Sequence, residues 1–124
     1  MNVLIAEDSP TMRRVVTGIV SQAFPDTEMF EAGDGKVAWD LLKIEEIDLV
    51  LSDWLMPEMN GLELIKSIRS NERLKNLPFV MVSTKGMKQD IIEAIRAGVS
   101  DYCVKPIQPL ILENKIKNAL AKGQ

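Results

Sequence analysis

The stretch Leu49-Val-Leu-Ser-Asp53-Trp-Leu-Met-Pro-Glu-Met-Asn-Gly61 is an apolar run that ends in an acidic residue and continues into turn residues. A short, nearly continuous apolar run is typical of a strand that is buried on both faces of a parallel sheet. Pro57 and the pair Asn60-Gly61 then favour a tight loop that opens a helix. We therefore predict that a central strand delivers Asp53 to the end of the sheet where this loop begins.

Other short apolar runs lie before and after this stretch. They lie at Val3–Ala6, Glu28–Ala32, Phe79–Val82 and Tyr102–Val104. The run at Glu28–Ala32 alternates apolar and acidic residues, which favours a position at the edge of a sheet. The other runs are nearly continuous and favour burial on both faces.

Apolar residues at helical spacing fill the segments between these runs. They recur over 12–23, 37–42, 62–68, 91–95 and 112–120. Ser9-Pro10 suits the start of the first helix, and Gly98 suits the end of the fourth. Five repeats of strand and helix predict one α/β domain over residues 1–124, with a parallel sheet covered by helices on both faces. The order of the strands does not follow from these runs.

The composition restricts the chemistry and the partners that we expect. A chain of 124 residues with 46% hydrophobic and 27% charged residues is one globular domain. It has no histidine and a single cysteine, Cys103, which excludes histidine-based nucleophile systems and cysteine-built zinc sites. The net charge of −3 argues against direct nucleic-acid binding. No long apolar segment or signal pattern is present, so we expect a cytoplasmic protein without membrane insertion.

Polar residues follow the apolar runs at their carboxyl ends, where open parallel sheets bind their ligands. They are Glu7, Asp8, Asp53, Ser83, Thr84 and Lys105. Two carboxylates about 4 Å apart repel each other by roughly 4 kcal/mol at an effective dielectric near 20. A group of three therefore favours a hard divalent cation, and an incomplete set of oxygen ligands suits Mg²⁺.

Each of these residues also has a purely structural interpretation. The pair Glu7-Asp8 could stabilise the dipole of the following helix, and Ser83 could be an ordinary turn residue. Lysines such as Lys105 end many strands as solvated charges, although Pro106 after it favours a fixed peptide bond that can be cis. None of these interpretations explains Asp53, which ends an otherwise apolar strand.

The motifs together resemble the receiver domain of two-component response regulators, and among these the stand-alone chemotaxis (CheY-like) receivers. The resemblance covers essentially the whole chain and is carried by Glu7-Asp-Ser-Pro-Thr-Met-Arg-Arg14, Asp53-Trp-Leu-Met-Pro-Glu-Met-Asn-Gly-Leu62, Ala97-Gly98 and Tyr102-Cys-Val-Lys-Pro106. It implies a doubly wound, flavodoxin-like (βα)5 fold with a five-stranded parallel sheet in the order 2-1-3-4-5.

The resemblance also implies the chemistry of the site. Asp53 is then the phosphoacceptor, which takes a phosphoryl group from a histidine kinase and forms an aspartyl phosphate. Asp8, Asp53 and the backbone carbonyl of Leu55 would hold Mg²⁺, with Glu7 acting through a bound water. The ammonium of Lys105 would neutralise charge that develops on the phosphoryl group.

The same resemblance implies a switch. Ser83 would bind a phosphoryl oxygen, and Tyr102 would then change its rotamer and alter the face of the fourth helix, fifth strand and fifth helix. The alternative for Tyr102 is a partly buried ring with its hydroxyl in water. On this basis we expect a signalling module rather than an enzyme, with a downstream protein target such as the flagellar motor switch.

Two residues depart from the pattern of many chemotaxis receivers. Leu55 stands where they carry asparagine, and Lys85 stands at a position that is often acidic. Both positions flank the line along which water attacks the phosphoryl group in the family. Leu55 cannot orient that water, and Lys85 could pair with the phosphoryl group, so we predict slow self-dephosphorylation.

Other functions fit parts of the pattern. A Mg²⁺-dependent phosphohydrolase would use the same carboxylates, but Leu55 offers no general acid. A flavin-binding protein would need a phosphate-cradling loop where Glu7-Asp8 stands. The chain could also be the receiver part of a longer regulator, although no helix-turn-helix pattern that would bind DNA follows the fifth helix.

Overall fold

Residues 1–122 are described by a computed structural model, and the last two residues of the predicted domain 1–124 lie outside this part. The described residues form a parallel sheet of five strands, β1 (Asn2–Ala6), β2 (Glu28–Ala32), β3 (Leu49–Ser52), β4 (Phe79–Ser83) and β5 (Asp101–Val104). Their order is β2-β1-β3-β4-β5, which confirms the order 2-1-3-4-5.

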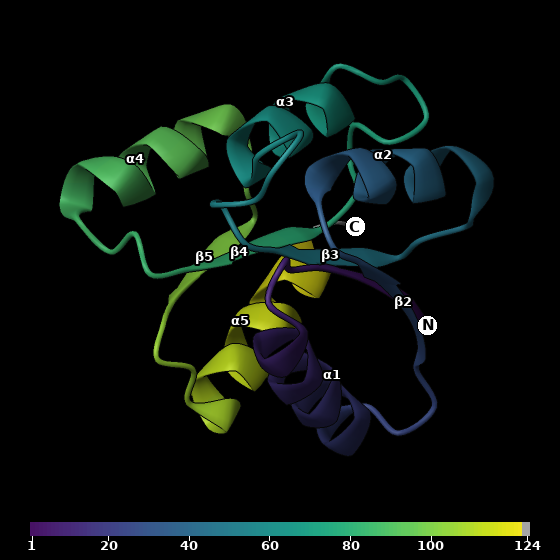
Figure 1. Cartoon of the computed structure of the whole chain (residues 1–124), viewed down its shortest axis with the longest axis vertical. Coiled ribbons are helices and arrows are strands. Elements are labelled where there is room, and N and C mark those ends of the chain that lie inside the picture. Colours follow the sequence, from purple (N-terminus) through teal and green to yellow (C-terminus); the bar gives the residue numbers. More distant parts are fainter. Residues whose placement is uncertain (123–124) are drawn as a thin grey trace.

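Helices alternate with the strands and cover both faces of the sheet (Figure 1). They are α1 (Pro10–Ala23), α2 (Gly35–Ile44), α3 (Gly61–Arg69), α4 (Lys88–Ala97) and α5 (Pro109–Lys122). The helices α2, α3 and α4 lie on one face, and α1 and α5 lie on the other (Figure 1). Within residues 1–122, no helix combines the length and the apolar character needed to span a membrane.

The strands contribute side chains to two hydrophobic cores, one on each side of the sheet. Leu4 and Ala6 of β1 pack in the core beneath α2, α3 and α4, whereas Val3 and Ile5 pack in the core against α1 and α5. This alternation is the two-residue period of a strand. Because both faces are covered, the central strands are continuous apolar runs, as the sequence predicted, and their polar residues Asn2, Ser52 and Ser83 lie at strand ends.

The edges of the sheet agree only in part with the sequence. β2 lies at one edge, as its alternating pattern predicted. β5 lies at the other edge, and its last residue, Val104, is 42% exposed although the run was predicted to be buried on both faces. Tyr102 and Cys103 are buried in opposite cores, because helices still cover both faces of this edge strand.

The spacing of apolar residues predicted the helices correctly. It did not predict correctly which of these residues are buried. Val15, Val37 and Ile95 belong to apolar stripes and are nevertheless exposed. In α4, Ala94 is fully buried and Ile91 packs beside the core, while Ile95 is 56% exposed. The apolar stripe of α4 is thus wider than the strip of the helix that contacts the sheet.

The predicted ends of the helices are confirmed. The Ser9 hydroxyl accepts a hydrogen bond from the Met12 amide at 3.2 Å, and Pro10 occupies the first turn of α1. Gly98 ends α4 in the left-handed region with φ of 113°. The Lys105–Pro106 peptide bond is cis.

The loop after β3 returns closely on itself before α3 begins. The Gly61 amide donates to the Trp54 carbonyl at 2.8 Å. A Cβ atom on residue 61 would lie 2.2 Å from the carbonyl oxygen of Asp53, a distance that real Cβ atoms do not adopt. Glycine is therefore required here by close packing against the backbone that carries Asp53.

This contact predicts opposite effects for two glycine substitutions. Gly61→Ala should lower the free energy of unfolding by about 1–3 kcal/mol, because the added methyl group forces the backbone apart. Gly18→Ala should raise it by about 1 kcal/mol, because Gly18 lies within α1 and an added Cβ meets nothing within 4 Å. Urea unfolding of both variants measures the difference, and equal midpoints would contradict the prediction.

Candidate functional site

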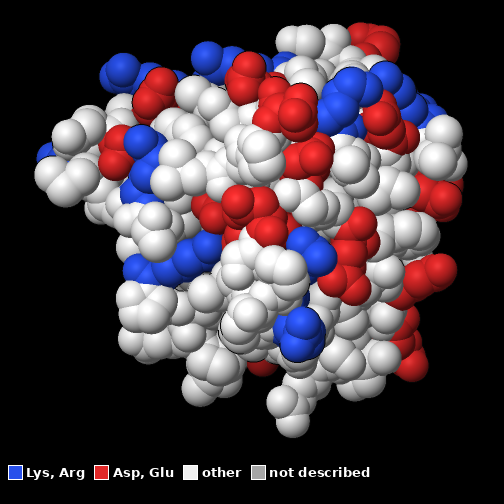
Figure 2. All heavy atoms as spheres, viewed as in Figure 1, with Lys and Arg blue, Asp and Glu red and all other residues white. Residues whose placement is uncertain are grey.

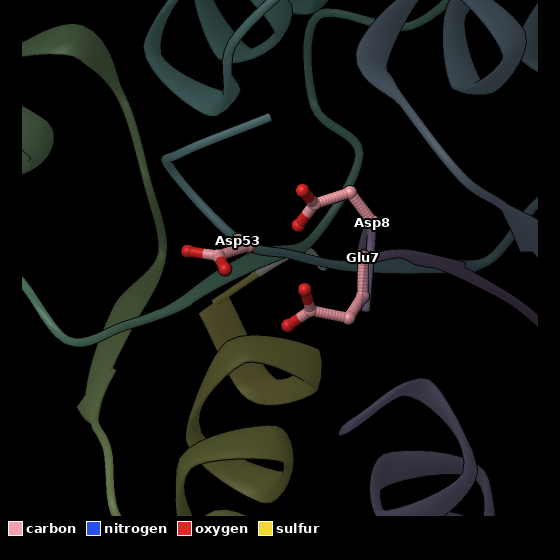
Figure 3. A group of neighbouring side chains, drawn as sticks. All are labelled: Glu7, Asp8 and Asp53. Atoms are coloured by element: carbon pink, nitrogen blue, oxygen red, sulfur yellow. The ribbon is translucent and has the colours of Figure 1, made fainter. Parts of the chain in front are cut away.

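Three carboxylates meet at the carboxyl edge of the sheet. Glu7 and Asp8 follow β1, Asp53 follows β3, and one oxygen atom of each lies within 4.8 Å of the others (Figure 3). Glu7 and Asp53 are buried, while Asp8 is exposed. The sequence prediction that these residues converge is confirmed, and Asp53 lies one residue beyond the end of β3.

Backbone hydrogen bonds of the sheet fix this convergence. The Asp53 amide donates to the Ala6 carbonyl at 2.9 Å, which continues the pairing of β1 with β3. The Glu7 amide donates to the Ala32 carbonyl at 3.0 Å. The Asp53 carboxylate is oriented locally, since its Oδ1 accepts from the Trp54 amide at 2.6 Å. The two acidic side chains are therefore held close by strand register.

Lys105 joins two of the carboxylates. Its Nζ lies 2.6 Å from Glu7 Oε1 and 2.9 Å from Asp53 Oδ2, and its side chain is only 10% exposed. Burial alone would lower the pKa of Lys105, but the hydrogen bonds to Glu7 and Asp53 outweigh burial and raise it. The lysine is therefore charged and fixed, which excludes the interpretation as a freely solvated strand end.

The site nevertheless keeps an excess of negative charge. Burial raises the pKa of Glu7, and hydrogen bonds from Lys105 and from the Ser9 amide offset only part of that effect. With every group ionised, three carboxylates and one ammonium carry a formal charge of about −2. Figure 2 shows acidic side chains gathered near the middle of the molecular surface seen in that view, with basic side chains beside them.

The donor set fits a hard divalent cation. The oxygen atoms of Glu7, Asp8 and Asp53 come from separate side chains and lie close enough to share one ion. Oxygen ligands in an incomplete shell are the environment that Mg²⁺ prefers, because it retains several waters. A divalent cation would also cancel the remaining charge of the site.

Ser83 and Tyr102 lie at the neighbouring strand ends. The Ser83 side chain is fully buried at the end of β4, and its hydroxyl accepts from the Lys85 amide at 3.2 Å. Tyr102 is 5% exposed, and its hydroxyl donates to the Lys85 carbonyl. The alternative of a tyrosine hydroxyl in water is therefore wrong for this structure. Thr84 is exposed.

Leu55 and Lys85, the two residues that differ from the pattern of many chemotaxis receivers, lie at the rim of the site. The Leu55 side chain is 54% exposed. The ammonium of Lys85 lies 4.7 Å from the centre of the Trp54 ring and 3.6 Å from Asp90 Oδ1. In this structure the charge of Lys85 is thus engaged by Trp54 and Asp90 and not by Glu7, Asp8 or Asp53.

Sequence reasoning missed three residues that support the site. Trp54 and Asp90 hold the ammonium of Lys85. Arg13 donates to the Glu7 carbonyl at 2.6 Å and pairs with Glu31 at 3.1 Å, and so links α1 to the residue that follows β1 and to β2. The position of Arg13 in the first turns of α1 is a sequence signal that could have indicated its contact with Glu7. No sequence pattern indicates the contact between Lys85 and Trp54.

The buried phenol predicts a clear titration. Burial raises the pKa of Tyr102, and hydrogen bonding to Ser83 offsets only part of this rise. The folded state therefore favours the neutral phenol. The contribution of Tyr102 to stability should be constant below about pH 10, and it should be lost as the pH rises through the raised pKa.

Absorbance at 295 nm measures this directly, because Tyr102 is the single tyrosine of the chain. The folded protein should form phenolate at a higher pH than the urea-unfolded protein. Coincident titration curves would contradict the burial of the hydroxyl.

Comparisons with known proteins agree with this geometry. The chain is similar to the chemotaxis protein CheY homolog of Campylobacter jejuni, with 42% identity over 124 residues that cover 99% of this chain and 95% of the relative. The structure of chemotaxis protein CheY4 of Vibrio cholerae is 28% identical, with a TM-score of 0.86 over 95% of this chain and 97% of that chain.

The Mn²⁺-bound form of the response regulator Rcp1 is 25% identical, with a TM-score of 0.78 over 97% of this chain and 89% of that chain. The family model of the response regulator receiver domain matches residues 3–117 of the chain. This match includes the carboxyl end of every strand described above, and the chain therefore belongs to the response regulator receiver family.

Proposed function

We propose that this chain is a phosphorylation-activated signalling receiver that takes a phosphoryl group from a histidine kinase onto Asp53. The observation that carries this proposal is the contact of Lys105 with both Glu7 and Asp53, beside the exposed carboxylate of Asp8. A nucleophile, a fixed cation and an acidic metal site thus lie together at the carboxyl edge of the sheet. This is what phosphoryl transfer to a carboxylate needs.

In the proposed reaction, a carboxylate oxygen of Asp53 attacks the phosphorus atom of a phosphohistidine. The new bond is Asp53 O–P, and the P–N bond breaks with its electron pair returning to the histidine of the kinase. The amides of Trp54 and Leu55, at 2.6 and 3.3 Å from Asp53 Oδ1, keep the carboxylate oriented. The ammonium of Lys105 stabilises charge on the phosphoryl oxygens.

Mg²⁺ is the metal that we propose for the site. Asp8 and Asp53 would hold it together with the Leu55 carbonyl, and Glu7 would act through a bound water. Bound Mg²⁺ supplies neutralising charge to the phosphoryl oxygens. The Mn²⁺ in the structure of Rcp1 supports a hard divalent cation in this fold.

The output that we propose is a change in the face formed by α4, β5 and α5. Ser83 would bind the phosphoryl group, and Tyr102 would report that event through its rotamer. This region exposes large apolar side chains, with Met87 at 62%, Ile95 at 56% and Val104 at 42%. These exposed apolar side chains are available for contact with a protein partner.

The relatives named as chemotaxis proteins support chemotaxis as the process and the flagellar motor switch as the target. In this role the domain acts in the cytoplasm and is no enzyme toward a separate substrate, although it promotes its own phosphorylation and dephosphorylation. We propose that residues 1–124 act together as one receiver domain.

Phosphorylation of the intact protein tests the proposal. Incubation with acetyl phosphate and Mg²⁺ should add one phosphoryl group, detected by intact-protein mass spectrometry. The adduct should be absent with excess chelator and in Asp53→Asn, and it should be strongly reduced in Asp8→Asn because the metal site loses a charged ligand. Glu58→Gln, at an exposed position of the same loop, is the matched control and should react normally.

The proposal would be contradicted if neither acetyl phosphate nor a purified histidine kinase produced the adduct. An adduct that persists in Asp53→Asn would place the phosphoryl group elsewhere. Lability of the adduct in base distinguishes an acyl phosphate from a phosphoester.

Leu55 gives a second prediction about the lifetime of the phosphoryl group. The phosphorylated protein should lose the group slowly, and Leu55→Asn should accelerate the loss by about tenfold, the value of one added hydrogen bond to the attacking water. Timed mass spectra after removal of the phosphodonor measure both rates. Leu55→Met, which keeps the apolar character, should leave the rate unchanged, and equal rates for all three proteins would contradict the prediction.

A further inference from the structure

Lys85 holds the loop between β4 and α4 through contacts of both its side chain and its backbone. Its side chain extends to Trp54, the residue that follows Asp53, and its backbone contacts Ser83 and Tyr102. The proposed function assigns roles to Ser83 and Tyr102 but gives no role to this side chain in the absence of a phosphoryl group.

The ammonium of Lys85 is bound on two sides. It lies 4.7 Å from the centre of the Trp54 ring, within the range of a cation–π interaction, and 3.6 Å from Asp90 Oδ1. Trp54 is only 6% exposed, so its ring is a fixed platform in the core beneath α2, α3 and α4. Asp90 belongs to the first turn of α4. The ammonium therefore ties the loop to the core below it and to the helix that follows it.

The backbone of Lys85 serves the two residues of the proposed switch. Its amide donates to the Ser83 hydroxyl at 3.2 Å, and its carbonyl accepts from the Tyr102 hydroxyl. Because the ring of Tyr102 is buried, its hydroxyl needs an acceptor inside the protein, and losing that acceptor is costly. The position of the Lys85 backbone thus contributes to the stability of Tyr102 in its buried place.

We propose that Lys85 is a positioning residue whose ammonium, clamped between Trp54 and Asp90, holds its own carbonyl where it retains Tyr102 in the buried position. The clamp operates without a phosphoryl group and so raises the population of the buried Tyr102 state in the resting protein. This inference rests on the proposed role of Tyr102 as a switch.

The charge of the residue is essential to this role. A cation is attracted both to the face of an aromatic ring and to the carboxylate of Asp90, whereas an acidic side chain at position 85 would be repelled by both. An uncharged side chain of similar length could still pack on Trp54 but would lose both attractions. Lys85→Met therefore removes the clamp with little change in shape, and Lys85→Arg keeps it.

A single fluorine label on tyrosine tests the clamp. The chain has one tyrosine, so protein grown with 3-fluorotyrosine gives a ¹⁹F signal from Tyr102 alone. The chemical shift and its change between H₂O and D₂O report how much of the ring is buried. Spectra are recorded without phosphodonor, and again with beryllofluoride and Mg²⁺ as a mimic of the phosphoryl group.

Without phosphodonor, Lys85→Met should lower the ratio of buried to exposed Tyr102 by about two- to fivefold, the change expected for loss of one partly exposed cation–π contact. Asp90→Asn should shift the ratio in the same direction, and Lys85→Arg should keep the ratio of the wild-type protein. Lys88→Met removes a nearby exposed charge that has no ion-pair partner among residues 1–122, and it should leave the signal unchanged.

A wild-type signal in both Lys85→Met and Asp90→Asn would overturn the clamp. An equal shift in Lys88→Met would also overturn it, because the effect would then be one of general charge. Beryllofluoride with Mg²⁺ could leave the ¹⁹F signal of every protein unchanged, while Lys85→Met alone still changes it. That result would contradict the proposed phosphoryl site and would support the clamp. Urea unfolding of each variant confirms that the spectra are those of folded protein.

Discussion

The contact of Lys105 with Glu7 and Asp53 is the interaction on which the functional edge of this domain depends. Two buried carboxylates would repel each other, and the ammonium between them makes their burial tolerable. The sheet provides the precision, because strand register places the ends of β1 and β3 side by side and β5 brings Lys105 across to them. The exposed carboxylate of Asp8 then adds charge that the lysine does not cancel, which leaves the site suited to a divalent cation.

Much of the fold could be read from the sequence, because both of its periodicities are strong. Buried parallel strands give continuous apolar runs, and the edge strand β2 gives an alternating one. The predicted site residues Glu7, Asp8, Asp53 and Lys105 were found from one rule, that ligands bind at the carboxyl ends of the strands. The strand order needed the family resemblance, since apolar runs carry no information about which strands are neighbours.

The remainder depends on contacts between distant segments, which local patterns do not encode. The ammonium of Lys85 lies on Trp54 although the two residues belong to different strand–helix units. The exposure of Ile95 follows from how narrowly α4 touches the sheet, and the exposed Val104 is the last residue of the edge strand β5. Hydrophobic periodicity identifies an apolar stripe but does not say how much of it another element covers.

The long separation between Glu7 and Lys105 has a consequence for the life of the protein in the cell. These residues are 98 positions apart, so the site exists only when the first and the last strands both occupy the sheet. A nascent chain that has not yet released β5 from the ribosome, or a molecule whose edge strand has come loose, lacks the lysine beside Asp53. Under the role that we propose for Lys105, competence to receive a phosphoryl group is thereby tied to completion of the fold.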